Sequence, residues 1–154
     1  MPKYVKEEAM ANILISSNHI LMPSDRNGYM QLYLYNMNGQ LLRKVTDGQY
    51  DVTDVYGYDE QTGATYYQAA GKNPMNREVY VTYKNGKTEC LTSRDGWNIA
   101  VFSADYKYFV NQWSDRNTPY EYGIFNNSGK ETVSLITNSE LKKTLAEYDL
   151  PSKE

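Results

Sequence analysis

The tetrapeptide Ser24-Asp25-Arg26-Asn27 decides how this sequence is interpreted, because it occurs again, unchanged, as Ser114-Asp115-Arg116-Asn117, 90 residues further along the chain. A second marker, an apolar residue followed by threonine, ends three strand-like runs at Val45-Thr46, Leu91-Thr92 and Ile136-Thr137. The steps of this marker are 46 and 45 residues, close to half of the first spacing. A fixed period of this size indicates a repeat architecture. The sequence therefore predicts three copies of a unit of about 45 residues.

Each unit contains four segments that are typical of antiparallel strands. The segments 31–35 and 79–83 are dense in β-branched and aromatic residues and have no apolar stripe of helical period. A polar turn separates the last two segments of every unit, at Asn38-Gly39, Asn85-Gly86 and Ser128-Gly129. The expected strands are 12–15, 19–22, 29–35 and 40–45 in the first unit, 52–58, 65–69, 78–83 and 87–91 in the second, and 97–102, 108–113, 120–125 and 131–136 in the third.

Four-stranded units with this period are typical of β-propeller blades. We therefore predict an all-β fold, a partial propeller of about three four-stranded antiparallel blades. The expected organisation is a charged lead-in at residues 1–8, blade-like repeats at 9–50, 51–96 and 97–137, and a helix with a connector at 138–154. A propeller closes with roughly 4 to 8 blades, so three blades leave two faces uncovered. The chain is expected either to be a fragment of a larger protein or to associate with copies of itself.

The pattern changes after Ile136. Thr137 and Glu140 form a capping-box signature, which marks the start of a helix. The apolar residues that follow share one helical face: Leu141, Leu145 and Tyr148. A short helix is expected from about residue 138 to residue 148, and Pro151 then favours extended backbone in a connector.

Composition excludes several classes of function. The net charge of −3 gives no basic surface for a nucleic acid, which is bound through clustered Lys and Arg. No apolar run reaches the ~18 residues that would span a membrane, and no signal peptide is recognised at the start. Cys90 is the only cysteine, so an intrachain disulfide and a thiolate metal cluster are excluded. The 16 tyrosines favour half-buried strand positions.

The order and spacing of these motifs resemble one family. The run SDRNGYMQLYLY at 24–35, followed by VTDGQYDV at 45–52, is similar to the late propeller blades of the N-terminal region of dipeptidyl peptidase IV, with a bacterial character. The segment FSADYKY at 102–108 resembles the hairpin that opens a blade in that family. Residues 138–154 resemble its exit from the last blade. The resemblance covers nearly the whole chain from about residue 9.

This resemblance implies an expected function. Members of the family are prolyl oligopeptidase-type serine exopeptidases that release Xaa-Pro or Xaa-Ala dipeptides, with a propeller covering an α/β-hydrolase domain that carries a Ser, Asp, His triad. The present chain would be the non-catalytic end of the propeller, which walls and gates the active-site chamber. Its implied partners are the hydrolase domain, the remaining blades and the peptide substrates of the parent enzyme. A periplasmic or cell-envelope location is implied by the resemblance alone.

The residues themselves offer few candidates for catalysis. His19 is the only histidine and is interpreted as a half-buried or surface strand residue rather than a general base. Cys90 is interpreted as an inert, packed thiol. The resembled family grips the substrate ammonium with an adjacent glutamate pair, but Glu7 and Glu8 precede the first strand here and are interpreted as a solvated terminus. No G-x-S-x-G nucleophile elbow is present, and no catalytic, cofactor or metal residue is predicted.

Other polar and aromatic residues are assigned structural roles. The repeated acidic residues are too far apart along the repeats to share an ion and are expected to cap turns: Asp25, Asp47, Asp95 and Asp115. Arg26 and Arg116 are expected to pair with a neighbouring aspartate or an adjacent blade. The sequon at 126–128 indicates at most an exposed turn, and Trp113 with the tyrosines is assigned to packing between blades rather than to a sugar platform.

Two functions of different class remain open. The first is the propeller segment of a dipeptidyl peptidase described above. The second is an independent propeller-like module that binds a protein or glycan and supplies its missing blades by self-association. A small stand-alone hydrolase ranks below both, because His19 would have to serve every proton transfer.

Overall fold

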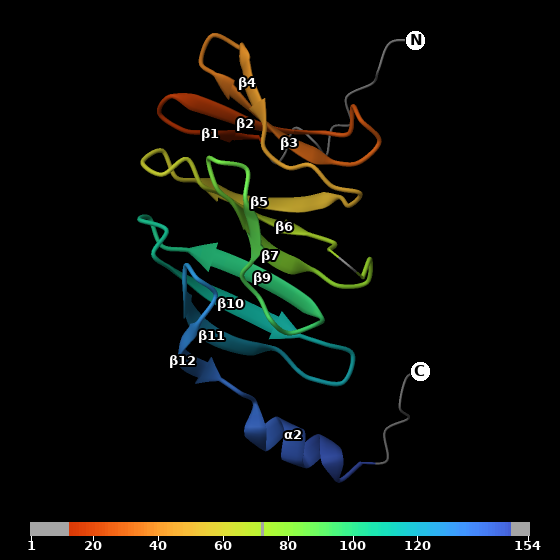
Figure 1. Cartoon of the computed structure of the whole chain (residues 1–154). Coiled ribbons are helices and arrows are strands. Elements are labelled where there is room, and N and C mark those ends of the chain that lie inside the picture. Colours follow the sequence, from red (N-terminus) through yellow and green to blue (C-terminus); the bar gives the residue numbers. More distant parts are fainter. Residues whose placement is uncertain (1–12, 72, 149–154) are drawn as a thin grey trace.

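The computed structural model describes residues 13–71 and 73–148, which form three antiparallel sheets stacked along the molecule (Figure 1). The first sheet holds β1 (Leu14–Ile15), β2 (His19–Ser24), β3 (Gln31–Asn36) and β4 (Leu41–Lys44); the second holds β5 (Val52–Tyr58), β6 (Thr65–Ala69), β7 (Glu78–Thr82) and β8 (Thr88–Cys90). The third holds β9 (Trp97–Phe102), β10 (Tyr108–Ser114), β11 (Glu121–Asn126) and β12 (Glu131–Ile136), and helix α2 (Ser139–Ala146) follows. The predicted all-β class and partial propeller of three four-stranded blades are therefore confirmed.

The strand order explains why local sequence signals predict this fold well. In every sheet each strand pairs with its neighbour in the chain, so only short connections are needed. Four strands, β5, β6, β9 and β12, have the expected bounds, and most of the others differ by one or two residues at an end. Two expectations were too long: β1 contains only Leu14 and Ile15, and β3 begins at Gln31 rather than at Tyr29.

The same turn closes the last hairpin of each blade. The amide of Gly39 donates to the carbonyl of Asn36 at 3.0 Å, and Gly129 donates to Asn126 at 3.0 Å. Gly86 repeats this contact in the second blade, and all three glycines have positive φ, from 77° to 86°. Gly129 has a further constraint, because a Cβ there would lie 2.5 Å from the carbonyl oxygen of Leu91. Glycine is therefore required at this turn by both conformation and space.

The apolar-threonine marker joins the outermost strand to the rest of its blade. The hydroxyl of Thr46 accepts a hydrogen bond from the amide of Leu32 at 2.9 Å, and the hydroxyl of Thr92 accepts one from Val79 at 3.1 Å. Thr46 and Thr92 are buried, whereas Thr137 at the third copy is exposed. The threonine of the marker is thus a buried hydrogen-bond acceptor in the first two blades and an exposed residue in the third.

Adjacent blades pack face to face through two hydrophobic clusters. The cluster between the first and second blades is formed by Leu21, Leu32, Leu34, Val45, Val52, Tyr58, Tyr67 and Ala69. The cluster between the second and third blades is formed by Ala64, Tyr66, Val79, Val81, Leu91, Ala100 and Phe109. Each cluster takes residues from two sheets, so neither blade can bury its apolar face alone.

Aromatic rings form the centre of the second cluster. Tyr66 stacks on Tyr106 with ring centroids 5.0 Å apart, and Phe109 lies between Phe102 at 4.9 Å and Phe125 at 5.4 Å. Burial raises the pKa of Tyr66 to about 12. The tyrosines expected to pack between blades are therefore found there, with ionisation of the phenol disfavoured.

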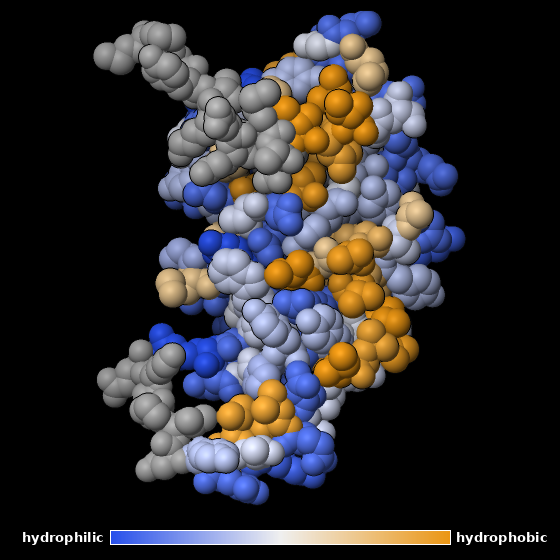
Figure 2. All heavy atoms as spheres, turned by 180° about the vertical axis from the view of Figure 1, so that it is seen from behind, coloured by the Kyte–Doolittle hydropathy of each residue, from blue (hydrophilic) through white to orange (hydrophobic). Residues whose placement is uncertain are grey.

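The outer face of the third blade carries an apolar row. Val110 of β10 lies opposite Val101 of β9 on one side and Ile124 of β11 on the other, and Ile124 lies opposite Val133 of β12. Val101 is 69% exposed and Val133 is 47% exposed. Figure 2 shows that hydrophobic side chains also reach the surface elsewhere, in patches along one side of the molecule. No further blade covers this row among the described residues.

Helix α2 confirms the expected helix but corrects its start. Asn138, in left-handed conformation with φ 50°, is the N-cap, and it makes no side-chain capping bond. The predicted capping box of Thr137 and Glu140 is therefore wrong. The side chain of Asn138 instead donates to the carbonyl of Tyr120, which ties the helix start to the third blade. Leu141 on the predicted apolar face is 44% exposed.

Some expectations fall on residues that the structure does not describe. The charged lead-in with Glu7 and Glu8 and the connector beyond residue 148 lie outside the described ranges. No helix in residues 13–71 and 73–148 is long and apolar enough to cross a membrane.

The packing between blades makes a prediction for stability. Phe109 is 1% exposed at the centre of the second cluster, so Phe109→Ala should lower the free energy of unfolding by about 3 to 5 kcal/mol. Leu42, which is 48% exposed, provides the control, and Leu42→Ala should change it by less than about 0.5 kcal/mol. Denaturant unfolding followed by tyrosine fluorescence measures both. Equal effects of the two substitutions would contradict the assignment of the core.

Candidate functional site

His19 is part of a polar contact between the first two blades. Its Nδ1 lies 2.7 Å from Oε2 of Glu60, and its side chain is 25% exposed. Burial alone would raise the pKa of Glu60, but hydrogen bonds from Ser16, Asn18 and His19 outweigh it and lower that pKa. The predicted half-buried strand histidine is confirmed.

The arrangement around Glu60 differs from a catalytic triad. In a triad the imidazole lies between the hydroxyl and the carboxylate and takes the hydroxyl proton. Here the Ser16 hydroxyl and the His19 ring both bind Glu60. No bond joins the Ser16 hydroxyl to the imidazole among the hydrogen bonds of the described residues. This cluster joins the β1–β2 turn to the β5–β6 turn.

Cys90 corrects one expectation. The residue is exposed at the end of β8, so the prediction of a packed thiol is wrong. Its thiol nevertheless donates a hydrogen bond to the backbone carbonyl of Thr92, with Sγ 3.1 Å from the oxygen. Desolvation of the sulfur raises the pKa of the Cys90 thiol. The neutral, weakly nucleophilic form is therefore favoured, in agreement with the chemical part of the prediction.

The repeated aspartates have different roles. Asp115 caps its turn as expected, because its Oδ1 accepts the amide hydrogen of Asn117 at 2.8 Å. Asp47 instead forms an ion pair with Lys44 at 2.6 Å. The carboxylate of Asp51, which was not singled out, accepts the amide of Met30 at 2.6 Å and joins two blades.

Arg26 makes several contacts within its own blade. Its guanidinium lies 4.1 Å from the ring centroid of Tyr33 and donates to the hydroxyl of Tyr35 at 2.8 Å. It therefore contacts aromatic residues of its own blade as well as the nearby hydroxyl of Ser24. The expected sequon lies, as predicted, in an exposed turn, with the Asn126 side chain accepting backbone hydrogens of that turn.

Trp113 and Arg94 pack against each other at the edge of the third blade. Trp113 is 7% exposed, and its indole N–H donates to the carbonyl of Asp95 at 2.8 Å. The Arg94 guanidinium lies 3.3 Å above the indole and binds Glu121 at 2.7 Å. Lys142 of α2 also forms an ion pair with Glu121. Trp113 is therefore buried, but against the β8–β9 loop, and it belongs to neither of the two clusters between blades.

Glu121 has unusual electrostatics because two cations bind it. Burial of its side chain, which is 12% exposed, would raise the pKa of the carboxyl. Hydrogen bonds and charge from Lys142 and Arg94 outweigh that effect and hold the pKa below its ordinary value. The ionised carboxylate therefore fastens both the β8–β9 loop and helix α2 to the third blade.

An open pocket of about 690 Å³ lies at one end of the blades. The second copy of the repeated tetrapeptide contributes to its wall, which is formed by residues 73, 75, 76, 95–97, 114–116 and 120. Three large side chains around it are exposed: Met75 by 76%, Trp97 by 44% and Tyr120 by 53%. The loops between β2 and β3, β6 and β7, and β10 and β11 all lie at this end (Figure 1). Such a surface is suited to contact with another protein segment.

Comparison with protein families gives a direct match. Residues 1–120 match the family described as the dipeptidyl peptidase IV (DPP IV) N-terminal region. The chain belongs to this family. The resemblance drawn from the repeats is thereby confirmed, and the three blades are blades of a DPP IV N-terminal region.

Relatives of the chain are larger proteins. A probable dipeptidyl peptidase 4 of Emericella nidulans is 27% identical over 153 residues, which cover 97% of this chain and 20% of the relative. The dipeptidyl peptidase 4 of Trichophyton equinum is 28% identical over 132 residues, covering 83% of this chain and 17% of that protein. The chain thus spans about a fifth of the length of the relatives that it matches.

Solved structures agree with this assignment. Porphyromonas gingivalis dipeptidyl peptidase 4 matches with a TM-score of 0.94 and 31% identity, over 100% of this chain and 22% of that one. A putative dipeptidyl aminopeptidase IV from Bacteroides ovatus matches with a TM-score of 0.69 and 19% identity, over 81% and 21% of the two chains. The second likeness shows the fold alone.

The polar contacts between blades were missed by sequence reasoning. Asn98 accepts a bond from the Gln68 side chain at its carbonyl, at 2.5 Å, and its own side chain donates to the carbonyl of Arg77 at 2.9 Å. Both side chains are buried, Asn98 by 99% and Gln68 by 94%. The only signal in the sequence was a polar residue inside a strand, which does not reveal its partner.

The Glu121 contacts predict a pH-dependent stability. Glu121→Gln should lower the free energy of unfolding by about 1 to 2 kcal/mol at pH 7, because two cations lose their partner. The folded-state pKa is depressed, so this contribution is present above the unfolded pKa of about 4.3 and is lost as the pH falls through the folded value. Denaturant unfolding between pH 7 and pH 3 measures the difference. Glu147→Gln on α2 is the control, and a gap that stays constant with pH would contradict the assignment.

Proposed function

We propose that this chain is a non-catalytic β-propeller segment of a dipeptidyl peptidase IV-like serine exopeptidase. The intact enzyme would release Xaa-Pro and Xaa-Ala dipeptides, and this segment would wall its active-site chamber and restrict entry to slender, unfolded peptides. The observation that carries the proposal is the match to P. gingivalis dipeptidyl peptidase 4 over the whole of this chain but only 22% of that one. The part of that relative outside the match has room for further blades and a hydrolase domain.

The packing of the blades supports a wall rather than a moving part. Two continuous clusters join the three sheets, and buried amide side chains bridge the second and third blades. The Glu60 cluster also joins the first two blades, through the β1–β2 and β5–β6 turns. Opening a gap between blades would expose these polar groups and rings together, which is costly. Selection of substrates would then depend on the chamber's fixed dimensions.

The end of the blades that carries the 690 Å³ pocket is the proposed face toward the hydrolase domain. Helix α2 leaves β12 at its C-terminal end, and β12 ends on the same side as β4 and β8, where the chain passes to the next blade. The exposed side chains of Met75, Trp97 and Tyr120 lie at this end and would be covered by such a domain.

Peptidase assays test the non-catalytic role. The purified chain should release no aniline product from Gly-Pro or Ala-Pro anilides, because the His19 ring binds Glu60 and receives no hydrogen bond from a hydroxyl or thiol among the described residues. The reading frame beyond the codon for Glu154 provides the second test, since a continuation that encodes G-x-S-x-G supports the proposal. A stop codon there would oppose it. Activity that persists after repurification and is abolished by His19→Ala would overturn the non-catalytic assignment.

The apolar row on the third blade predicts self-association of the isolated chain. Val101→Lys combined with Val110→Lys should shift the chain toward monomer at micromolar concentration, because charges would be placed in the contact. Sedimentation velocity measures the distribution. Gln61→Lys in the exposed β5–β6 turn is the matched control and should leave it unchanged. A wild-type chain that is already monomeric would contradict the prediction.

The alternative of an independent interaction module predicts a different form of association. A module that completes its own propeller requires a closed ring of one stoichiometry, because heterologous contacts close only at a defined rotation. A single ring species together with a stop codon after Glu154 would favour this alternative. A mixture of sizes with a longer reading frame favours the peptidase segment.

A further inference from the structure

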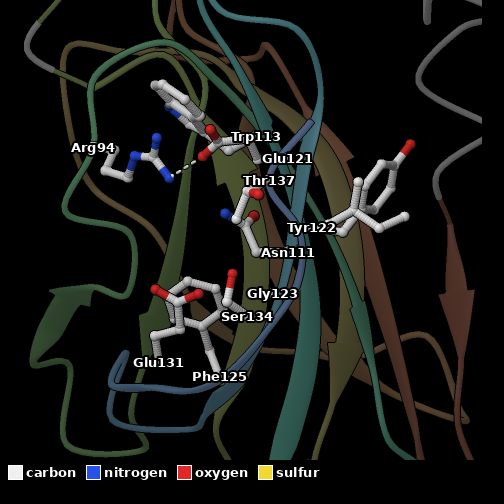
Figure 3. Close-up of a pocket in the computed structure, with 11 residues that line it drawn as sticks. Arg94, Asn111, Trp113, Glu121, Tyr122, Gly123, Phe125, Glu131, Ser134 and Thr137 are labelled. Atoms are coloured by element: carbon white, nitrogen blue, oxygen red, sulfur yellow. Dashed lines mark ion pairs between the residues drawn. The ribbon is translucent and has the colours of Figure 1, made fainter. Parts of the chain in front are cut away.

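A second pocket, of about 270 Å³, lies within the third blade and is unrelated to the loop-end surface (Figure 3). It is bounded by residues of β10, β11 and β12 and by Arg94 of the β8–β9 loop. Figure 3 shows the Asn111 side chain in the middle of the pocket, with Glu131 and Phe125 on one side and the Arg94 and Glu121 pair on the other. The pocket is formed entirely by residues of this chain.

Asn111 places an unpaired acceptor in this pocket. The residue is 5% exposed, and its Oδ1 is buried without a hydrogen-bond partner among the described residues. Its Nδ2 donates to Oδ1 of Asn98 at 2.9 Å. The Asn98 amide nitrogen already donates to the carbonyls of Arg77 and Arg94, so Asn98 Oδ1 requires a donor. The orientation of Asn111 is therefore determined by its neighbours, and its oxygen is directed away from them.

Glu131 brings a negative charge to the same place. Gly123 lies directly opposite Asn111 in the β10–β11 pair, so both residues face the same side of the sheet. Oε1 of Glu131 lies only 2.8 Å from the position that a Cβ on Gly123 would occupy. The absence of a side chain at Gly123 thus leaves room for the carboxylate on the face of the sheet that carries Asn111. No ion pair of Glu131 is found among the described residues.

The remaining walls define the shape of a ligand. Phe125 and Ile136 provide apolar surface. Arg94 forms an ion pair with Glu121 and lies over the ring of Trp113, so its charge is already paired with that carboxylate. The buried Asn111 oxygen and the carboxylate of Glu131, an exposed residue of β12, therefore both border this space, whose walls also include Ser134 and Thr137. An unpaired buried acceptor is costly, and a positively charged donor suits both an amide oxygen and a carboxylate.

We propose that this pocket binds a primary ammonium group carried on a short apolar stem. An ammonium has three donors, which can serve the Asn111 oxygen, the Glu131 carboxylate and water, while its stem contacts Phe125 and Ile136. An anion would be repelled by both acceptors. A divalent metal requires several oxygen ligands, whereas this pocket offers one free carboxylate and one amide oxygen. The site does not depend on peptidase activity.

Titration with n-butylammonium chloride tests the proposal on the full chain at constant ionic strength. Amide signals of Gly123 and Ser134, followed by ¹H–¹⁵N NMR, should shift saturably with a Kd on the order of 1 mM. Butanol and sodium chloride should cause no saturable shift. The amide of Nα-acetyl-lysine is the second probe: binding of both would identify lysine side chains as ligands, and binding of butylammonium alone would identify a small free amine.

Matched variants distinguish binding in this pocket from nonspecific attraction of the ammonium to surface carboxylates. Glu131→Gln should weaken butylammonium binding at least about fivefold, in line with loss of a charge-assisted hydrogen bond. Gly123→Ala should also weaken it by placing a methyl group against Glu131 and Phe125. Glu147→Gln, an exposed carboxylate on α2, should leave it unchanged. Absence of saturation, equal binding of butanol, or full binding by Glu131→Gln would overturn the proposal, and only water would then occupy the pocket.

Discussion

The packing of one sheet against the next is the interaction on which this structure depends. Each blade has two apolar faces because its strands alternate between them, and each face is buried only by a neighbouring blade. The middle blade meets this condition, with Tyr67 on one side and Val79 on the other completely buried. The third blade does not, and its Val101 is 69% exposed. Stability is therefore a property of pairs of blades rather than of a single sheet.

This constraint explains what the sequence could predict. Strands β5, β6 and β9 were located to the residue because turn residues bound them and because pairing is between neighbours in the chain. The period gave the number of blades, and the order of motifs gave the family. In the third blade the repeat overestimates burial, because no further blade packs there among the described residues. Ile136-Thr137 matches the marker, yet Ile136 is 47% exposed.

Interactions across blades could not be predicted from spacing. Asn98, Asn111 and Gln68 are polar residues in strands, and nothing in their neighbours along the chain indicates that they bond to one another or across 30 residues. The predicted capping box at the start of α2 was wrong for a related reason. The signal of Thr137 and Glu140 is local, whereas the position of the helix depends on bonds from Asn138 and Lys142 to Tyr120 and Glu121 of the third blade.

The same dependence makes the position of Asn111 informative. Phe109 and Trp113 are its neighbours on the same face of β10, and both are large and well packed. An apolar side chain at 111 would extend that surface over Gly123 and would remove a buried acceptor, whose cost is about 1 to 3 kcal/mol. Asn111 does satisfy Asn98, but a single donor would be enough for that bond. Its Oδ1 without a partner, Gly123 opposite it and the Glu131 carboxylate against Gly123 occur together on one face of the sheet, and the proposed ammonium ligand would account for all three.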